Sequence, residues 1–370
     1  MNKKMRRIRV LITGAGSGAS GNLIRALKSL NPRPHVVGLN DDPFTLELSL
    51  AERNYLSPKP TSDLFVNAML EVVRREQINV IMPTDDQVVK VLSDSRDRFT
   101  IELLLPRYET VDLCQDKHKL NMFLRRRGIR VPQTYLVRSL RDLDRIFARF
   151  SGAGVLWCRA RHGSRSLAAF PVATAEQART WITQWCNFQG MEASDFTVGE
   201  YLPGRHFLIQ SVWLNGSLLR AQSTEFLDYF AGGNNPSGVF SLSGLAKTVV
   251  ATEALKVALD AVRALEQHPS GTFCVELRES GDGWPAITEI NAGRFPSGIT
   301  SLLAMGSDNM VALFVSAALG QPITVTDQYG SALEYYLVRD VDALPQIFPA
   351  ADVLQGVCRI DPGQVANEVP

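Results

Sequence analysis

The stretch that decides the fold runs from Phe273 to Arg294 and reads FCVELRESGDGWPAITEINAGR. Two strand-like apolar runs flank Gly281-Asp282-Gly283. Asp-Gly is a favoured centre for the two-residue turn of a β-hairpin. A two-residue turn at Asp282-Gly283 would place Glu276 directly opposite Glu289, and Glu289 would share a strand face with Asn291. The sequence therefore predicts a hairpin on which two glutamates face each other.

Glutamates that face each other across a strand pair destabilise the pair unless a positive charge lies between them. Glu276, Glu289 and Asn291 supply oxygen ligands, which Mg²⁺ prefers and zinc does not. Gly293-Arg294 follows at once and brings a guanidinium group close to the acids. A solvated strand face with ordinary surface acids is the alternative interpretation. We predict that Glu276, Glu289 and Asn291 form a metal site.

The N-terminal hundred residues alternate short apolar runs with helical patterns, which is typical of a parallel, Rossmann-like sheet. The run Ile8–Thr13 ends in the motif Gly16-x-Gly18-x-x-Gly21, and Asp41 follows twenty residues later. This spacing matches a dinucleotide-binding fingerprint. Tight strand-to-helix turns favour glycine whether or not phosphate binds there. A nicotinamide-dependent oxidoreductase therefore stays open as an alternative function.

Composition excludes several classes of protein. The 370 residues are 45% hydrophobic and 21% charged, as in soluble globular proteins, and 39 basic against 38 acidic residues give a net charge of +1. This balance gives no general reason to expect a nucleic-acid or membrane partner.

The longest apolar stretch, 310–319, is too short to span a bilayer. The basic N-terminus precedes an apolar run that is too short for an export signal. Five scattered cysteines are typical of free thiols in the reducing cytoplasm, which is the expected location.

Several further motifs occur in a fixed order along the chain. Asp116-Lys117 precedes a basic helix that is followed by Gly128-Ile129-Arg130-Val131-Pro132-Gln133-Thr134. A strand glutamate is followed by a Pro-Gly turn in Glu200-Tyr201-Leu202-Pro203-Gly204. Glu289-Ile290-Asn291 is followed by Arg294. Together these motifs resemble the ATP-grasp superfamily, in particular its carboxylate–amine ligases and the synthetase halves of carbamoyl phosphate synthase.

The resemblance implies a fold that is part α/β and part α+β, with a Rossmann-like pre-ATP-grasp domain before a two-lobed ATP-grasp fold. The implied boundaries are residues 1–112 for the first domain, 113–192 for a small lid subdomain and 193–330 for a large subdomain with the metal site. Residues 331–370 would form a C-terminal strand extension.

The resemblance also assigns roles to residues. Glu276, Glu289 and Asn291 would hold Mg²⁺, with Mn²⁺ as a substitute, against the phosphates of ATP. Arg294 would steady the reacting acyl group, and Lys117 and Arg159 would clamp phosphate as catalytic cations. The remaining cofactor-binding residues implied by the resemblance are Gly163 and Ser164 in the phosphate loop, Glu200, Tyr201 and Leu202 at the adenine, and His206 beside the ribose.

The implied function is that of an ADP-forming ligase, which activates a carboxylate as an acyl phosphate and couples it to an amine. Its partners would be small-molecule carboxylate and amine substrates, which meet between the N-terminal layer and residues 225–243. The candidate contacts are Tyr229, Asn234, Asn235 and Ser297. A non-catalytic ATP-grasp-like nucleotide-binding protein is a further alternative, because His206 and a loop with Gly163 as its one glycine depart from the family pattern. A homodimer is the default assembly for such an enzyme.

Overall fold

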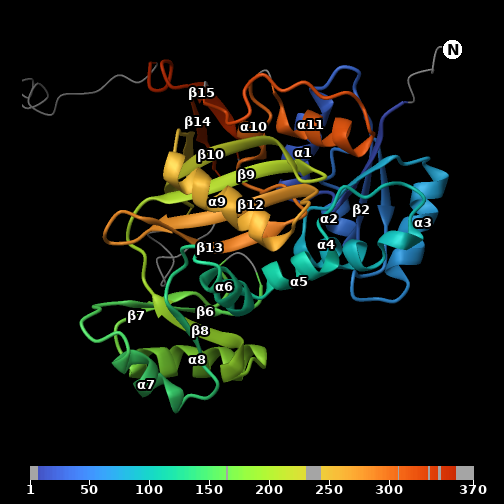
Figure 1. Ribbon diagram of the computed structural model, residues 1–370. Coiled ribbons are helices and arrows are strands. Elements are labelled where there is room, and N and C mark those ends of the chain that lie inside the picture. The colour runs from blue at the N-terminus through green and yellow to red at the C-terminus, as the bar shows by residue number, and fades with distance from the viewer. Residues whose placement is uncertain are drawn as a thin grey trace, which may run out of the picture.

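The computed structural model describes residues 7–163, 166–230, 243–306, 308–331, 334–340 and 343–355. Three β-sheets organise this part of the chain. Figure 1 shows the N-terminal layer in blue beside a central sheet in yellow and orange, with a small green lobe below that sheet.

The N-terminal layer is a parallel sheet in the order β3-β2-β1-β4, as the alternating pattern predicts. Its central strands, β1 (Arg9–Thr13) and β2 (His35–Asn40), are largely buried because helices cover the sheet. Helix α3 (Phe65–Arg75) turns Phe65 and Met69 into this core. The other elements of this region are α1 (Gly18–Lys28), α2 (Pro43–Leu46), β3 (Arg53–Leu56), β4 (Val80–Met82), α4 (Asp86–Asp94) and α5 (Tyr108–Gln115).

Antiparallel strands in the order β13-β12-β9-β10-β11-β14-β15 form the central sheet. Helices α6 (Lys117–Arg126) and α9 (Thr252–Leu265) share one hydrophobic core with it. Helices α1, α10 (Thr300–Leu303) and α11 (Met310–Ala318) share another. Strand β9 (His206–Leu214) is buried along nearly its whole length because both of its faces are covered. The remaining strands are β10 (Ser217–Tyr229), β11 (Ser243–Thr248), β12 (Gly271–Glu279), β13 (Pro285–Ala292), β14 (Tyr335–Val338) and β15 (Gln346–Pro349).

The small lobe is an antiparallel sheet in the order β5-β8-β6-β7, with α7 (Asp142–Ala148) and α8 (Ala175–Gln189) packed on it. Its hydrophobic core is separate from those of the central sheet. Its strands are β5 (Thr134–Leu136), β6 (Leu156–Ala160), β7 (Phe170–Val172) and β8 (Phe196–Glu200). Strand β8 pairs within this lobe, although the boundary expected at residue 193 places it with the large subdomain.

The β12–β13 hairpin brings the two glutamates together by a different route from the predicted one. Glu276 pairs with Glu289, as predicted. The turn, however, is not a two-residue turn at Asp282-Gly283, because the strands end at Glu279 and Pro285. A β-bulge compensates: Leu277 pairs with Ile287, which leaves Thr288 as the extra residue. The turn shifts the pairing by one residue from the predicted register, and the bulge shifts it back before the functional pair.

The architecture confirms the predicted mixture of a parallel α/β layer with antiparallel α+β lobes. Within the described ranges, none of the helices combines the length and the apolar character needed to cross a bilayer. Cys114, Cys158, Cys186 and Cys274 are free thiols, and Cys358 lies outside the described residues.

The glycine-rich turn after β1 is packed against protein. Gly16 has φ +93°, and a Cβ atom there would lie 1.7 Å from the backbone oxygen of Thr45. Gly18 has open space around it. Asp41, the acid of the predicted fingerprint, is exposed. The close approach of Thr45 thus accounts for the glycine at position 16 without a bound dinucleotide.

Replacing the two glycines separates packing from other roles. We expect Gly16→Ala to lower the free energy of unfolding by at least about 2 kcal/mol, because it adds backbone strain and a clash. Gly18→Ala should change it by less than about 0.5 kcal/mol. Urea unfolding followed by circular dichroism measures both values. Equal stability of the two variants would contradict this packing.

Candidate active site

The two glutamates lie at the centre of the site. Side chains of Glu276 and Glu289 are each 21% exposed. Burial raises the pKa of Glu276, while the positive charges of Arg294, Arg278 and other nearby cations oppose the rise. The ammonium of Lys117 lies 3.6 Å from Glu289 Oε2. This facing acidic pair is the most concentrated negative charge in the site.

His206 lies behind Glu276 and does not neutralise it. Its Nε2 atom is 3.5 Å from Glu276 Oε2 and makes no hydrogen bond among the described residues. Burial lowers the pKa of His206 to about 3, and the nearby charge of Arg278 adds to this effect. The Nδ1 atom contacts the hydroxyl of Tyr229, whose pKa burial raises to about 12. His206 is therefore a neutral wall of the site and not a surface residue.

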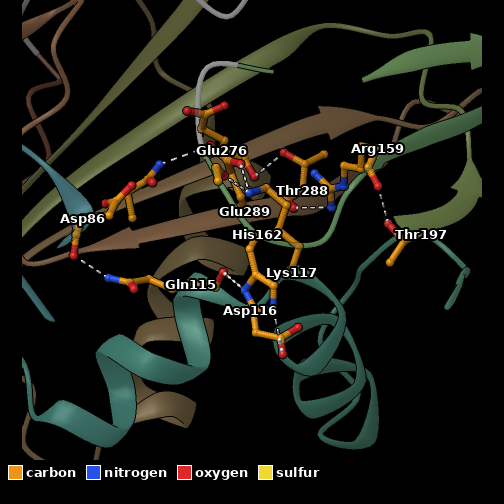
Figure 2. A network of polar contacts seen from close by, with 12 residues as sticks. Asp86, Gln115, Asp116, Lys117, Arg159, His162, Thr197, Glu276, Thr288 and Glu289 are labelled. Atoms are coloured by element: carbon orange, nitrogen blue, oxygen red, sulfur yellow. Dashed lines mark hydrogen bonds and ion pairs between the residues drawn. The ribbon is translucent and has the colours of Figure 1, made fainter. Parts of the chain in front are cut away.

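The bulge at Thr288 connects the hairpin to the small lobe. Arg159 on β6 donates a hydrogen bond of 2.8 Å from Nη2 to the carbonyl oxygen of Thr288 (Figure 2). Burial lowers the pKa of Arg159, and the charges of Glu289 and Glu276 oppose this effect. An arginine from one lobe thus lies against the acidic strand of the other.

The N-terminus of α6 holds the second predicted cation. Asp116 caps this helix and accepts hydrogen bonds of 2.8 and 2.6 Å from Arg161. Burial would raise the pKa of Asp116, but Arg161 and the backbone N–H of Lys119 together lower it to about 2. The ammonium of Lys117 also donates to the carbonyl oxygen of Gly163. This arrangement fixes the start of the predicted phosphate loop beside Lys117.

Arg294 contacts an acid that the sequence analysis did not identify. Its guanidinium lies 2.5 and 3.0 Å from the two carboxylate oxygens of Asp86, at the start of α4. It also donates a hydrogen bond of 2.8 Å to Asn291 Oδ1, and Asn291 Nδ2 lies 3.3 Å from Glu289 Oε1. Asp86 lies four residues after the end of the buried strand β4, and that position was the signal that could have indicated it.

A cavity of about 260 Å³ lies between the small lobe and the central sheet. Glu276 and Glu289 lie at one end of it, and Trp157, Ala160 and Leu202 provide apolar wall. The cavity includes most of the predicted cofactor-binding residues, namely Lys117, Arg159, Gly163, Glu200, Tyr201, Leu202 and His206. Ser164 lies outside the described residues.

The segment Glu200–Gly204, which we call the hinge, connects the two lobes at the rim of this cavity. The N–H of Glu200, at the end of β8, donates to the carbonyl oxygen of Gln133 at 2.8 Å. Leu202 is buried, whereas Tyr201 is 40% exposed. At Gly204 a Cβ atom would lie 2.5 Å from the Cβ of Glu279, so the turn requires glycine to pack on the end of β12.

A second cavity of about 310 Å³ lies on the other side of the acidic pair. Glu276 and Glu289 line both cavities. The N-terminal layer contributes Asn40 and Asp86 to this second cavity, and Arg294 lies in its wall. Ser297 also lines it, while Tyr229 lines the first cavity; Asn234 and Asn235 lie outside the described residues.

Comparison with known proteins identifies the fold. No protein-family model and no curated protein sequence matches the chain. Among solved structures, the L-amino acid ligase of Bacillus licheniformis is 16% identical, with a TM-score of 0.64 over 85% of this chain and 74% of that one. The biotin carboxylase of Campylobacter jejuni is 13% identical, with a TM-score of 0.69 over 90% and 76%. The N5-carboxyaminoimidazole synthetase of Staphylococcus aureus is 14% identical, with a TM-score of 0.65 over 91% and 84%.

The chain has the ATP-grasp fold. In the ATP-grasp arrangement of this protein, the small lobe and the central sheet enclose the first cavity, and the N-terminal layer closes the second. The acidic hairpin is the element common to both cavities.

The Asp116 cap offers a test of how firmly the site is fixed. Its pKa lies near 2 against 3.8 for a free aspartate, so its stabilisation is complete above pH 4 and is lost as the pH falls through 2. We expect Asp116→Asn to lower the free energy of unfolding by about 2 kcal/mol at pH 7, and by roughly half as much at pH 3.

Urea unfolding at the two pH values measures this difference. The exposed Asp41→Asn is the control and should leave the stability unchanged. A loss for Asp116→Asn that does not depend on pH would show that charge is not its cause.

Proposed function

We propose that this protein is an ADP-forming ligase that uses Mg²⁺ and ATP to activate a substrate carboxylate and couple it to an amine. The observation that supports this proposal most is the position of Glu276 and Glu289. They face each other between two cavities, one between the lobes and one against the N-terminal layer. A metal held there would contact a nucleotide on one side and an acceptor on the other.

The side chains fit a hard divalent cation. Among the described residues, no three His, Cys, Asp or Glu side chains converge on one point. Glu276 and Glu289 would therefore hold Mg²⁺ together with Asn291, and phosphate oxygens would complete the ligand set, as is usual for this metal. When bound, the metal neutralises the charge that develops on the transferred phosphoryl group.

The first cavity suits a nucleotide. Trp157, Ala160 and Leu202 offer apolar surface for a base beside the hinge. Lys117 and Arg159 lie toward the acidic pair, where phosphates would be placed. Because one of these cations comes from α6 and the other from the small lobe, both can clamp the phosphates only when the lobes are close together. The structural neighbours include a biotin carboxylase complexed with a magnesium salt of ADP, which supports this assignment.

The second cavity suits the acceptor. Its wall carries Arg294, held by Asp86 and Asn291 so that the guanidinium faces the acidic pair. A carboxylate placed there would attack the terminal phosphorus of ATP, and an amine would then displace phosphate from the resulting acyl phosphate. Arg294 would stabilise the oxyanion of the tetrahedral adduct through hydrogen bonds aimed at the developing charge. Amino acids are the default substrates, and the neighbouring L-amino acid ligase supports that choice.

Binding of nucleotide tests the proposal before any acceptor is known. At a hundredfold excess over Kd, ATP with Mg²⁺ should raise the melting temperature by about 3 °C, because it binds only the folded chain. Glu289→Gln should abolish the rise, and Glu253→Gln, an exposed acid on α9, should retain it.

Thermal-shift titrations with ATP and with NADH, each with and without Mg²⁺, distinguish the proposed ligase from the alternative functions. A shift with NADH and none with ATP would favour the oxidoreductase alternative. An ATP shift without ADP release in any amino-acid pairing would favour a non-catalytic nucleotide-binding protein.

Arg294 should matter for chemistry more than for nucleotide binding. With a productive carboxylate and amine, we expect Arg294→Gln to reduce the rate of ADP release at least about 100-fold, because one oxyanion donor is lost. The Mg²⁺-dependent ATP shift should remain. Arg294→Lys keeps the charge without the paired contact to Asp86. Its rate of ADP release should lie between those of the wild type and of Arg294→Gln. Equal loss of ATP binding and turnover in Arg294→Gln would contradict this separation.

A further inference from the structure

Positive charge is concentrated in one short segment. Residues 117–149 contain ten basic and two acidic side chains, whereas the rest of the chain has 29 basic against 36 acidic ones. Eight of the ten cations are arginines. The net charge of +1 hides this asymmetry, and the proposed ligase chemistry uses only Lys117 from the segment.

Four of these arginines converge on a cavity of about 430 Å³ between α6 and the β5–α7 region. We call this cavity the arginine groove; it is lined by Arg125, Arg138, Arg145 and Arg149 together with His118 and Tyr135. No acidic side chain of the described residues lines it. Thr134 is the one residue that also lines the proposed nucleotide cavity, so the two sites are separate.

Only one of the four arginines in the groove, which are all exposed to solvent, has an acidic partner among the described residues. Among the described residues, Arg125 and Arg138 have no acidic group within ion-pair distance. The guanidinium of Arg149 lies 4.9 Å from the ring centroid of Tyr135. Arg145 pairs with Asp142 at 2.7 Å. His118 Nδ1 is buried and has no hydrogen-bond partner in the described part of the chain. Clustered guanidinium groups repel one another unless an anion lies between them.

The arginine groove lies between elements that belong to two different hydrophobic cores. Helix α6 packs through Leu120 and Leu124 into the core of the central sheet. Helix α7 packs through Leu143 and Ile146 into the core of the small lobe. Arg125 therefore belongs to one body, and the other three arginines belong to the other. An anion in the groove would connect them.

We propose that the arginine groove binds a small, multiply charged anion with phosphate or carboxylate groups, which ties the small lobe to the central sheet. The cavity has the size of a small-molecule site. Arginine forks pair with the planar oxygens of phosphate and carboxylate. A ligand that fixes the angle between the lobes changes nucleotide affinity, and the nucleotide changes ligand affinity by the same factor. This last step rests on the proposed nucleotide site, whereas anion binding itself does not.

Calorimetric titration of the full chain with pyrophosphate and with citrate, without Mg²⁺ or nucleotide, tests the site. Arg138→Gln/Arg149→Gln should weaken binding by about tenfold for each arginine removed. The control, Arg126→Gln/Arg141→Gln, removes the same charge from exposed positions outside the groove and should bind like the wild type. Unchanged melting temperatures would show that both variants fold. Tighter binding of pyrophosphate would indicate a ligand with phosphate groups, and tighter binding of citrate would indicate a ligand with carboxylate groups.

The proposal would be overturned if the wild type and both double variants bound the anions equally, or if none of the three bound either anion. Tight binding of a single-stranded oligonucleotide with no binding of either small anion would also overturn it, in favour of a nucleic-acid surface. For the coupling, the Kd of ATP should change on adding saturating anion in the wild type and not in Arg138→Gln/Arg149→Gln. An unchanged Kd in the wild type would refute the link between lobes. Failure of ATP to bind at all would refute the proposed function and leave the anion titration decisive for the groove.

Discussion

The repulsion between Glu276 and Glu289 is the constraint on which the rest of the site depends. Two carboxylates held opposite each other on paired strands, partly out of water, require positive charge nearby. The chain provides it from several elements at once: Lys117 from α6, Arg159 from the small lobe and Arg294 from the end of β13. None of these cations pairs fully with the acids. Lys117 also bonds to Gly163, Arg159 to Thr288, and Arg294 to Asp86. The remaining negative charge suits a divalent cation.

The same arrangement explains why the fold has separate bodies. Helices cover both faces of the central sheet, and its strand pairing holds the two glutamates opposite each other. The small lobe has its own core and contacts the acidic hairpin through the Arg159–Thr288 hydrogen bond (Figure 2). In the proposed ligase, the cavity between these two lobes would admit a nucleotide and then exclude water from the reacting groups, which would protect an acyl phosphate from hydrolysis.

Sequence alone predicted the elements whose signals are local. The parallel layer and the pairing of Glu276 with Glu289 followed from spacing, and the structure confirms them. The bulge at Thr288 could not be predicted, because the turn shifts the pairing by one residue and the bulge shifts it back, which leaves no trace in the spacing. Asp86 was missed because its contact with Arg294 spans 208 positions and depends on how the N-terminal layer docks.

Burial was the other property that spacing did not reveal. The resemblance placed His206 beside the ribose, but the sequence did not show that this residue is buried on β9 with its pKa lowered to about 3. The glycine motif at Gly16 pointed to a dinucleotide, because sequence does not show that the backbone of Thr45 takes up the space. In each of these cases, residues distant along the chain decide the environment.

The most direct measurement is Mn²⁺ binding by electron paramagnetic resonance, with the metal replacing Mg²⁺ and with ATP present. The free Mn²⁺ signal should fall when protein and nucleotide are together, beyond the decrease that ATP alone produces. Glu276→Gln/Glu289→Gln should return the signal to that of ATP alone, because the facing carboxylates hold the metal. Undiminished Mn²⁺ binding in the double variant would contradict the account, since the charge on the hairpin would then have no role in holding the metal.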